Sequence, residues 1–344
     1  MSVQDLIFAA AGASGLRLVA VGSDTTPYLS VYPWTSSGFG AKLSNPATLP
    51  TGFVSDVAFS PDGAFMAVAH GTSPYVSVYP IAGGAIGAKV SNPATLPTGQ
   101  GNGVAFSPDG AFLAVAHTGA PYLSVYPWSS SGFGAKVTNP ATTLGSNGYR
   151  VTFSPNGAFI VAASQSTPYV HAYPWSGSGF GTKVANPATL MTSSGYGLAF
   201  SPDGSAVVVG SLSTPFVHAY AWSSGFGAKK ANPATLPPGY GWDAAFSPDG
   251  AFVAVGHSGS PSVSVYPWTG GTFGVRLADP TTIPAGTTGR GVAYHPDGSA
   301  LAVSTGETPF VHAYAWAGGF GTKVSNPASL PPGVSRVVAF SPLL

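Results

Sequence analysis

Short apolar segments, separated by turns of glycine, proline, serine and asparagine, recur along the whole chain. In residues 104–117 the apolar runs Val-Ala-Phe and Phe-Leu-Ala-Val-Ala flank a Ser-Pro-Asp-Gly turn at 107–110. Proline presets φ at the first central position of such a turn, aspartate bonds to nearby backbone, and glycine tolerates a positive φ. The pattern predicts two antiparallel strands joined by a tight turn.

This strand–turn–strand pattern repeats with a nearly constant period. Its turn prolines lie 46 to 48 residues apart, at Pro61, Pro108, Pro155, Pro202, Pro248, Pro296 and Pro342. A period of this length indicates a stack or ring of equal supersecondary units. Within one period we expect four strands, at 104–106, 112–117, 122–128 and, starting near Lys136, 136–138.

Both faces of the predicted strands are apolar, as both alternating sets of positions at 112–116 show. A sheet with one face in water would alternate with polar residues, so we expect each unit to be covered by a neighbour on either side. The chain is therefore predicted to be an all-β, seven-bladed β-propeller of four-stranded antiparallel blades. A helical solenoid is excluded because 47 glycines and 33 prolines would break its helices.

The ends of the repeat indicate how the ring closes. The final copy of the first strand, at 336–342, has no strand after it. The first blade, at 16–49, in turn lacks a good copy of its own first strand. We expect 336–342 to complete the N-terminal blade and to close a single domain spanning 1–344, since closure removes open edges. Residues 5–10 are the alternative closing strand; otherwise residues 1–14 form an N-terminal arm or an extra strand.

The composition excludes several classes of function. Charged residues make up 7% of the chain and the net charge is +1, so the basic field that nucleic-acid binding needs is missing. We expect no membrane insertion, because no apolar run is long enough to span a bilayer. We also expect no signal peptide, since residues 1–5 lack a basic start. Without cysteine there is no disulfide or thiolate chemistry.

Comparison of the copies shows positions that change in pairs on the second and third strands. Positions seven apart carry one histidine and one hydroxyl residue in either order: His70/Ser77, His117/Ser124, Ser164/His171, Ser211/His218, His257/Ser264 and Thr305/His312. We interpret them as cross-strand hydrogen bonds. The alternative is a ring of metal-binding or catalytic histidines, but no carboxylates accompany them at ligand spacing.

Tryptophan and phenylalanine change together around the loop from the third to the fourth strand. The pairs are Trp34/Phe39, Trp128/Phe133, Trp175/Phe180, Trp222/Phe226, Trp268/Phe273 and Trp316/Phe320, with Ile81/Ile86 in the second blade. Joint replacement predicts that the two side chains pack on each other. Sugar-stacking sites are the alternative.

A cation occupies the same place in every copy: Lys42, Lys89, Lys136, Lys183, Lys229, Arg276 and Lys323. We expect this cation ring to pair with the turn aspartates Asp62, Asp109, Asp203, Asp249 and Asp297, each pair contributing about 0–1 kcal/mol. The functional alternative is a ring that binds an anionic neighbour.

The copies differ most just before each first strand. One position there holds Ser55, Asn102, Tyr149, Tyr196, Trp242, Arg290 or Arg336, and the next holds Asp56, Gly103, Arg150, Gly197, Asp243, Gly291 or Val337. First strands are innermost in a propeller, so these residues surround the mouth of the central channel. We predict a recognition site for a polar ligand or a protein, formed by Asn102, Tyr149, Arg150, Tyr196, Trp242, Asp243, Arg290 and Arg336. The alternative is ordinary drift of solvated loop residues.

The turns at 60–63, 107–110, 201–204 and 247–250 resemble the inner hairpins of WD-repeat-like propellers, and this resemblance covers nearly the whole chain. The Trp-Asp dipeptide and the Gly-His pair are missing from their expected places, which indicates a divergent relative. The run Ser-Gly-Phe-Gly-Ala-Lys-Val-Thr-Asn-Pro-Ala-Thr at 131–142 resembles repeats of bacteriophage-encoded propellers. That resemblance implies a virion component, made in the cytoplasm and located on a particle outside the cell.

We therefore expect a non-catalytic binding or structural propeller of a phage particle, acting in capsid decoration, in the tail or in host-surface recognition. Its partner would be a virion protein or a host glycan, with no cofactor and no metal. One alternative is a propeller lactonase or hydrolase with a divalent metal in the channel. Against it, only Asp56 and Asp243 lie near the mouth, and no nucleophile–base–acid set is present. A further alternative is a lectin with repeated sites on the Thr-Pro-Tyr and Asn-Pro-Ala-Thr loops.

Overall fold

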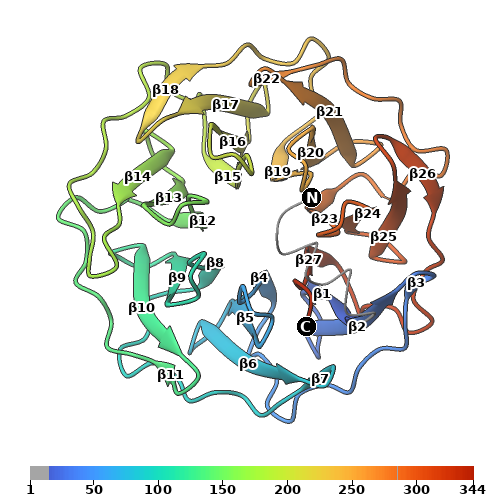
Figure 1. The fold of residues 1–344 in the computed structure, drawn as a ribbon, viewed down its shortest axis with the longest axis horizontal. Coiled ribbons are helices and arrows are strands. Elements are labelled where there is room, and N and C mark those ends of the chain that lie inside the picture. Colours follow the sequence, from blue (N-terminus) through green and yellow to red (C-terminus); the bar gives the residue numbers. More distant parts are fainter. Residues whose placement is uncertain (1–14, 285) are drawn as a thin grey trace.

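The computed structural model describes residues 15–284 and 286–344. Seven antiparallel sheets stand in a ring around a central channel, with the first strand of each sheet innermost (Figure 1). The described residues form no helix, and therefore none that could cross a membrane. The predicted seven-bladed β-propeller is confirmed. The predicted strand at 5–10 and the arm at 1–14 lie outside the described residues.

Strands of the seven blades follow one order, and blades are numbered here by their second strands. The first strands are β27 (Ser335–Phe340), β4 (Val54–Phe59), β8 (Gly101–Phe106), β12 (Gly148–Phe153), β15 (Gly195–Phe200), β19 (Gly241–Phe246) and β23 (Gly289–Tyr294). The second strands are β1 (Arg17–Ser23), β5 (Phe65–His70), β9 (Phe112–His117), β13 (Phe159–Ser164), β16 (Ala206–Ser211), β20 (Phe252–His257) and β24 (Ala300–Thr305). The third strands are β2 (Leu29–Thr35), β6 (Val76–Ala82), β10 (Leu123–Ser129), β14 (Val170–Pro174), β17 (Val217–Trp222), β21 (Val263–Thr269) and β25 (Val311–Trp316).

The fourth strands are short and lie earlier in the sequence than expected. They are β3 (Gly38–Phe39), β7 (Ala85–Ile86), β11 (Gly132–Phe133), β18 (Phe226–Lys229), β22 (Thr272–Phe273) and β26 (Phe320–Lys323). Blade 4 has three strands, and the bridge between Trp175 and Phe180 takes the place of the fourth. The prediction that the fourth strand starts near Lys136 is wrong, because pairing centres on the aromatic pair, as between Trp128 and Phe133.

The C-terminal strand closes the ring, as predicted. β27 pairs antiparallel with β1 and places Val19 opposite Phe340 and Val21 opposite Val338. The N–H of Leu18 also donates to the Ser341 hydroxyl at 2.8 Å. The closing strand thus replaces the open edge that β1 would otherwise present.

The core lies between the blades, in accordance with strands that are apolar on both faces. One cluster joins Ala69 and Val78 of blade 2 to Leu113 and Val115 of blade 3, all fully buried. The third-strand tyrosines reinforce this packing in a way that the sequence did not indicate. Each donates its buried hydroxyl to a carbonyl of the preceding Asn-Pro-Ala-Thr or equivalent loop, at 2.7–3.0 Å.

Predicted histidine–hydroxyl pairs are confirmed in four blades. The imidazole Nε2 and the hydroxyl lie 2.9–3.1 Å apart in His70/Ser77, His117/Ser124, Ser164/His171 and His257/Ser264. The pair Ser211/His218 is different, and the prediction is wrong there. Ser211 donates to the Ser213 carbonyl at 3.0 Å, and the imidazole of His218 has no hydrogen-bond partner among the described residues.

The aromatic pairs pack as predicted. In all six Trp/Phe pairs the rings meet edge to face, with centroids 4.9–5.5 Å apart. Five of these tryptophans are only 7–8% exposed. Their faces are therefore used in packing and are not open for sugar stacking.

Candidate functional site: the channel mouth

Glycine begins five of the first strands because another chain segment lies very close there. A Cβ on Gly148 would lie 2.6 Å from the carbonyl oxygen of Tyr122, and one on Gly195 would lie 2.7 Å from that of Tyr169. Tyr122 and Tyr169 have positive φ values of 72° and 69° and follow cis proline bonds. This contact fixes the start of each first strand, so the next side chain is held at the rim of the channel.

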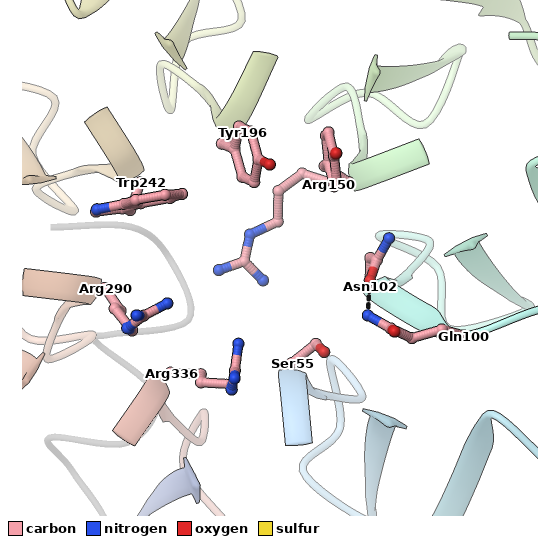
Figure 2. Close-up of a pocket in the computed structure, with 9 residues that line it drawn as sticks. Ser55, Gln100, Asn102, Arg150, Tyr196, Trp242, Arg290 and Arg336 are labelled. Atoms are coloured by element: carbon pink, nitrogen blue, oxygen red, sulfur yellow. Dashed lines mark hydrogen bonds between the residues drawn. The ribbon is translucent and has the colours of Figure 1, made fainter. Parts of the chain in front are cut away.

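Those next side chains enclose a pocket at the channel mouth with a volume of about 320 Å³. Its lining consists of Ser55, Gln100, Asn102, Tyr149, Arg150, Tyr196, Trp242, Arg290 and Arg336 (Figure 2). Seven of the eight predicted site residues are brought together here, while Asp243 lies below the pocket. Sequence reasoning missed Gln100, whose amide donates to Asn102 Oδ1 at 2.7 Å. Gln100 lies just before the first strand, at a position where no other copy has glutamine.

Two arginines give the pocket a positive charge that forms no ion pair with any described carboxylate. The Arg290 guanidinium lies 5.6 Å from the Trp242 ring, and that of Arg336 lies 4.6 Å from the Phe53 ring. Neither forms an ion pair within the described part of the chain, and the Nε atoms of both are buried without a hydrogen-bond partner. Burial, together with the charge of Arg290, lowers the pKa of Arg336, while Asp24 acts in the opposite direction.

A third arginine, Arg150, crosses the channel and forms the floor of the pocket. Its guanidinium reaches the middle of the mouth (Figure 2) and forms ion pairs with Asp56 and with Asp243, the latter at 3.5 Å. Burial disfavours its charge, but the two aspartates outweigh this effect and raise the pKa of Arg150. Blades 2, 4 and 6 are thereby connected through one buried cation.

The two aspartates are also fully engaged with the backbone. Asp56 accepts the N–H groups of Val57 and Val104, each at 3.0 Å. Asp243 accepts the N–H of Val292 at 3.1 Å. Burial raises the pKa of Asp243, with the charge of Arg150 acting against it. The carboxylates therefore serve to hold Arg150 and to tie neighbouring blades together.

Glycine occupies the same position in blades 3 and 5, which lie between these charged residues, and in blade 7. A Cβ on Gly197 would lie 2.5 Å from the Cα of Asp243, and one on Gly103 would lie 2.9 Å from the Cα of Arg150. Neighbouring first strands therefore approach too closely for a side chain at every blade. This explains why charged residues and glycines alternate at this position.

Aromatic side chains form the opposite wall of the pocket. Tyr149 and Tyr196 stack at 4.0 Å with an angle of 16°, and Tyr196 meets the edge of Trp242 at 5.1 Å. Burial raises the pKa of Tyr196, so its phenol is neutral at pH 7. The pocket thus combines an apolar wall with two unpaired cations.

The cation ring lies apart from this pocket, and its predicted pairing with the turn aspartates is wrong. Each cation instead bonds to the asparagine or aspartate three residues later, as Lys229 does to Asn232 at 2.6 Å. The turn aspartates bind within their own turns; Asp109, for example, accepts the Ser107 hydroxyl and the N–H of Ala111. Binding of an anionic neighbour by this ring stays a prediction.

No protein-family model matches the chain, and a search of the curated proteins finds no match. Solved structures with the same fold do exist. A putative 6-phosphogluconolactonase from Bacteroides fragilis is 15% identical, with a TM-score of 0.77 over 96% of this chain and 99% of the other. A periplasmic gluconolactonase from Pseudomonas aeruginosa is 18% identical, with a TM-score of 0.74 over 96% and 100%. A putative 6-phosphogluconolactonase from Bacteroides uniformis is 17% identical, with a TM-score of 0.76 over 95% and 100%.

These comparisons correct our interpretation of the sequence. Proteins that share the fold over its whole length are named as lactonases and not as virion components, so the expectation of a non-catalytic phage propeller is wrong. Membership of the WD-repeat family is not supported either. At 15–18% identity the likeness itself shows the fold.

Proposed function

We propose that the chain is a hydrolase that opens a sugar lactone carrying a negative charge, bound at the channel mouth. The observation that carries the proposal is the pair Arg290 and Arg336, two guanidinium groups that face one pocket without an ion-pair partner among the described residues. The names of the structures with the same fold, 6-phosphogluconolactonase and gluconolactonase, support the reaction class.

The pocket suits such a ligand in size and in chemistry. Its volume of about 320 Å³ is at the lower end of the range of small-molecule sites. Arg290 and Arg336 supply donors for an anionic group. The aromatic wall of Tyr196 and Trp242 offers an apolar surface for one face of a sugar ring, and Gln100 with Asn102 offers amide groups for its hydroxyls.

Electrostatic stabilisation is the catalytic contribution that this lining can make. Water adds to the lactone carbonyl, the bond from that carbon to the ring oxygen breaks, and the ring oxygen receives a proton to give a hydroxy acid. Negative charge develops on the carbonyl oxygen during the addition, and fixed donors aimed at that oxygen lower the barrier. The lining residues include no histidine, lysine, cysteine or carboxylate, so we assign no covalent intermediate.

The metal-dependent form of this reaction does not fit the residues. The described part of the chain has no group of three or more histidines and carboxylates that could hold a metal ion. Asp56 and Asp243, the two carboxylates below the mouth, are occupied by Arg150 and by backbone N–H groups. We therefore derive no step through a metal.

The test is hydrolysis of 6-phosphogluconolactone and gluconolactone, followed by proton release and corrected for the spontaneous reaction. We expect acceleration by the wild type and a loss of at least about 100-fold in kcat/KM for 6-phosphogluconolactone in Arg290→Gln/Arg336→Gln, because two hydrogen bonds to a charged group, of about 1.5–3 kcal/mol each, are lost. Lys136→Gln, at a cation outside the pocket, is the matched control and should keep full activity. Absence of acceleration by the wild type, or equal activity in the double variant, would refute the proposal.

A further inference from the structure

A second cavity lies at the seam where blade 7 meets blade 1. Its volume is about 700 Å³, and its lining includes Arg17, Trp34, His295, Asp297, Ala300 and Lys323. None of these residues lines the pocket at the channel mouth. The cavity is therefore a separate place on the molecule, to which the proposed hydrolysis assigns no role.

This seam lacks an aromatic ring that four other seams have. In those seams a phenylalanine at the start of the second strand packs edge to face against the tryptophan of the next blade, as Phe252 does against Trp316 at 5.3 Å. Blade 7 has Ala300 at this position, as blade 5 has Ala206. Trp34 instead packs on the imidazole of His295, with ring centroids 5.9 Å apart.

Two polar side chains at this seam depart from the internal repeat. Arg17 stands where blade 3 has Ala111, and His295 stands where blade 3 has the turn residue Ser107. His295 is only 3% exposed. Arg17 Nη1 and His295 Nε2 are both buried and have no hydrogen-bond partner among the described residues. A buried polar group without a partner is destabilising, so a ligand that satisfies both of these atoms beside one cavity gains binding free energy from each.

The charges around the cavity favour an anion. Arg17 and Lys323 are cationic, and Asp297 is the carboxylate in the lining. Asp297 is already engaged, because it contacts His295 Nδ1 and accepts the N–H of Ser299 at 2.8 Å. Lys323 donates to Asn326, which is neutral. Arg17 thus keeps a charge that no carboxylate in the described part of the chain pairs with.

The imidazole adds a second requirement for the bound group. Burial lowers the pKa of His295, and Arg17 acts in the same direction, while the hydrogen bond and charge of Asp297 oppose the shift. The ring is therefore neutral at pH 7. Its contact with the Asp297 carboxylate assigns the proton to Nδ1, so Nε2 is an acceptor. A ligand that satisfies both orphaned atoms offers an anionic oxygen to Arg17 and a hydroxyl to His295.

We propose that the seam cavity binds a small oxyanion that also carries a hydroxyl, such as hydrogen phosphate or a hydroxycarboxylate, between Arg17 and His295. The bound ligand connects blade 7 to blade 1, the blade that the C-terminal strand completes. It therefore stabilises the closed ring without entering the channel mouth.

Thermal unfolding with inorganic phosphate tests the proposal. The experiment uses Arg290→Gln/Arg336→Gln as its background, so that anions at the mouth do not contribute, and ionic strength is held constant with sodium chloride. We expect the melting temperature to rise with phosphate, because a ligand that binds only the folded state stabilises it. Arg17→Ala in this background, which restores the alanine found in blades 2, 3, 4 and 6, should raise the phosphate dissociation constant at least about tenfold, since a charge-assisted bond is lost.

A second arm tests the role of the imidazole. Sulfate resembles hydrogen phosphate in shape but has no hydroxyl at pH 7, so it should stabilise the background variant less than phosphate does. His295→Ser, which restores the turn serine, should remove this preference. Equal phosphate affinity with and without Arg17, or no phosphate-dependent shift in the background variant, overturns the proposal. If sulfate and phosphate stabilise the background variant equally, His295 does not accept a hydrogen bond from the ligand. Lactone hydrolysis by the Arg17→Ala single variant is expected to be unchanged, which separates this proposal from the one at the mouth.

Discussion

The two ends of the innermost strands differ in how strictly they repeat. At one end the Ser-Pro-Asp-Gly turns are nearly identical, and each satisfies its own polar groups, as Ser107 and Asp109 do. At the other end, the channel mouth, polar side chains contact partners in other blades, as Arg150 of blade 4 contacts Asp56 of blade 2 and Asp243 of blade 6. The turn residues thus serve the blade that carries them, whereas the irregular residues at the mouth build one shared site.

This difference indicates where changes affect folding and where they affect binding. A repeated contact is present several times, so a condition that disrupts all its copies together has a large effect on stability. A mouth residue such as Arg290 contacts the Trp242 ring but forms no ion pair in the described part of the chain, so its replacement leaves no buried carboxylate without a partner. Replacing Arg150 should affect both binding and folding, because it lines the pocket and is buried between two carboxylates.

The largest effect is expected from removing the strand that closes the ring. Deletion of residues 335–344 leaves β1 with an open edge and exposes the apolar faces that β27 covers. We expect the free energy of unfolding to fall by more than about 5 kcal/mol, beyond the range of ordinary substitutions, with loss of a cooperative melt. Circular dichroism and calorimetry would measure this. A melt like that of the full chain would mean that β27 is dispensable for closure.

The fold was accessible from the sequence because the repeat makes each signal visible several times. The turn prolines gave the period, apolar positions on both strand faces gave the stacking of blades, and the unpaired last copy, 336–342, gave the closure. The fourth strand was misplaced because its position depends on packing between Trp128 and Phe133. The lysine that marked it in the sequence bonds to an asparagine three residues later.

The site was accessible only in part. Departure from the repeat indicated Tyr149, Tyr196, Trp242, Arg290 and Arg336, and the innermost strands place these residues around one pocket at the mouth. Their role in binding stays a prediction. The ion pairs of Arg150 cross the channel between blades that are not neighbours, and a single repeat carries no signal for such contacts. Lactone hydrolysis was only an alternative from the sequence, because the lining lacks a recognisable nucleophile and base, and it stays a proposal.

The second largest effect is expected from acid, which acts on a repeated feature. Burial lowers the pKa of six histidines to about 4, from the usual value of 6.5 for an exposed imidazole: His70, His117, His171, His218, His257 and His312. Between these values the unfolded chain binds more protons than the folded chain, so stability falls as the pH is lowered from 6.5 towards 4. We expect a loss of about 1 kcal/mol or more per histidine, because one pKa unit corresponds to about 1.4 kcal/mol. Denaturant unfolding at several pH values measures it.

A matched variant isolates one histidine of this set. His117→Ser leaves Ser124 opposite a serine, the arrangement that blade 1 has with Ser23 and Ser30. This variant should reduce the pH dependence of the free energy of unfolding by about one sixth, because His117 is one of six equivalent histidines. Asp109 and Asp203, whose pKa values are lowered by hydrogen bonds, lose their contribution only at lower pH. Stability that is constant between pH 6.5 and 4.5 would contradict the assignment of neutral, buried imidazoles.

A smaller effect, confined to one site, is expected from Arg150→Met. Methionine fills a similar volume, but Asp56 and Asp243 then face each other without their cation, and breaking a buried ion pair is destabilising by about 3–5 kcal/mol. The pKa of Asp243, already raised by burial, should rise further, so protonation should narrow the gap to the wild type as the pH falls towards 5. Adding Asp56→Asn and Asp243→Asn to Arg150→Met should restore most of the stability at pH 7, because no charge is then left buried. Urea unfolding of the wild type, the single variant and the triple variant measures these differences in stability. A single variant within about 1 kcal/mol of the wild type would show that the aspartates are held by the backbone alone, and that the mouth, like the turns, is built from contacts local to each blade.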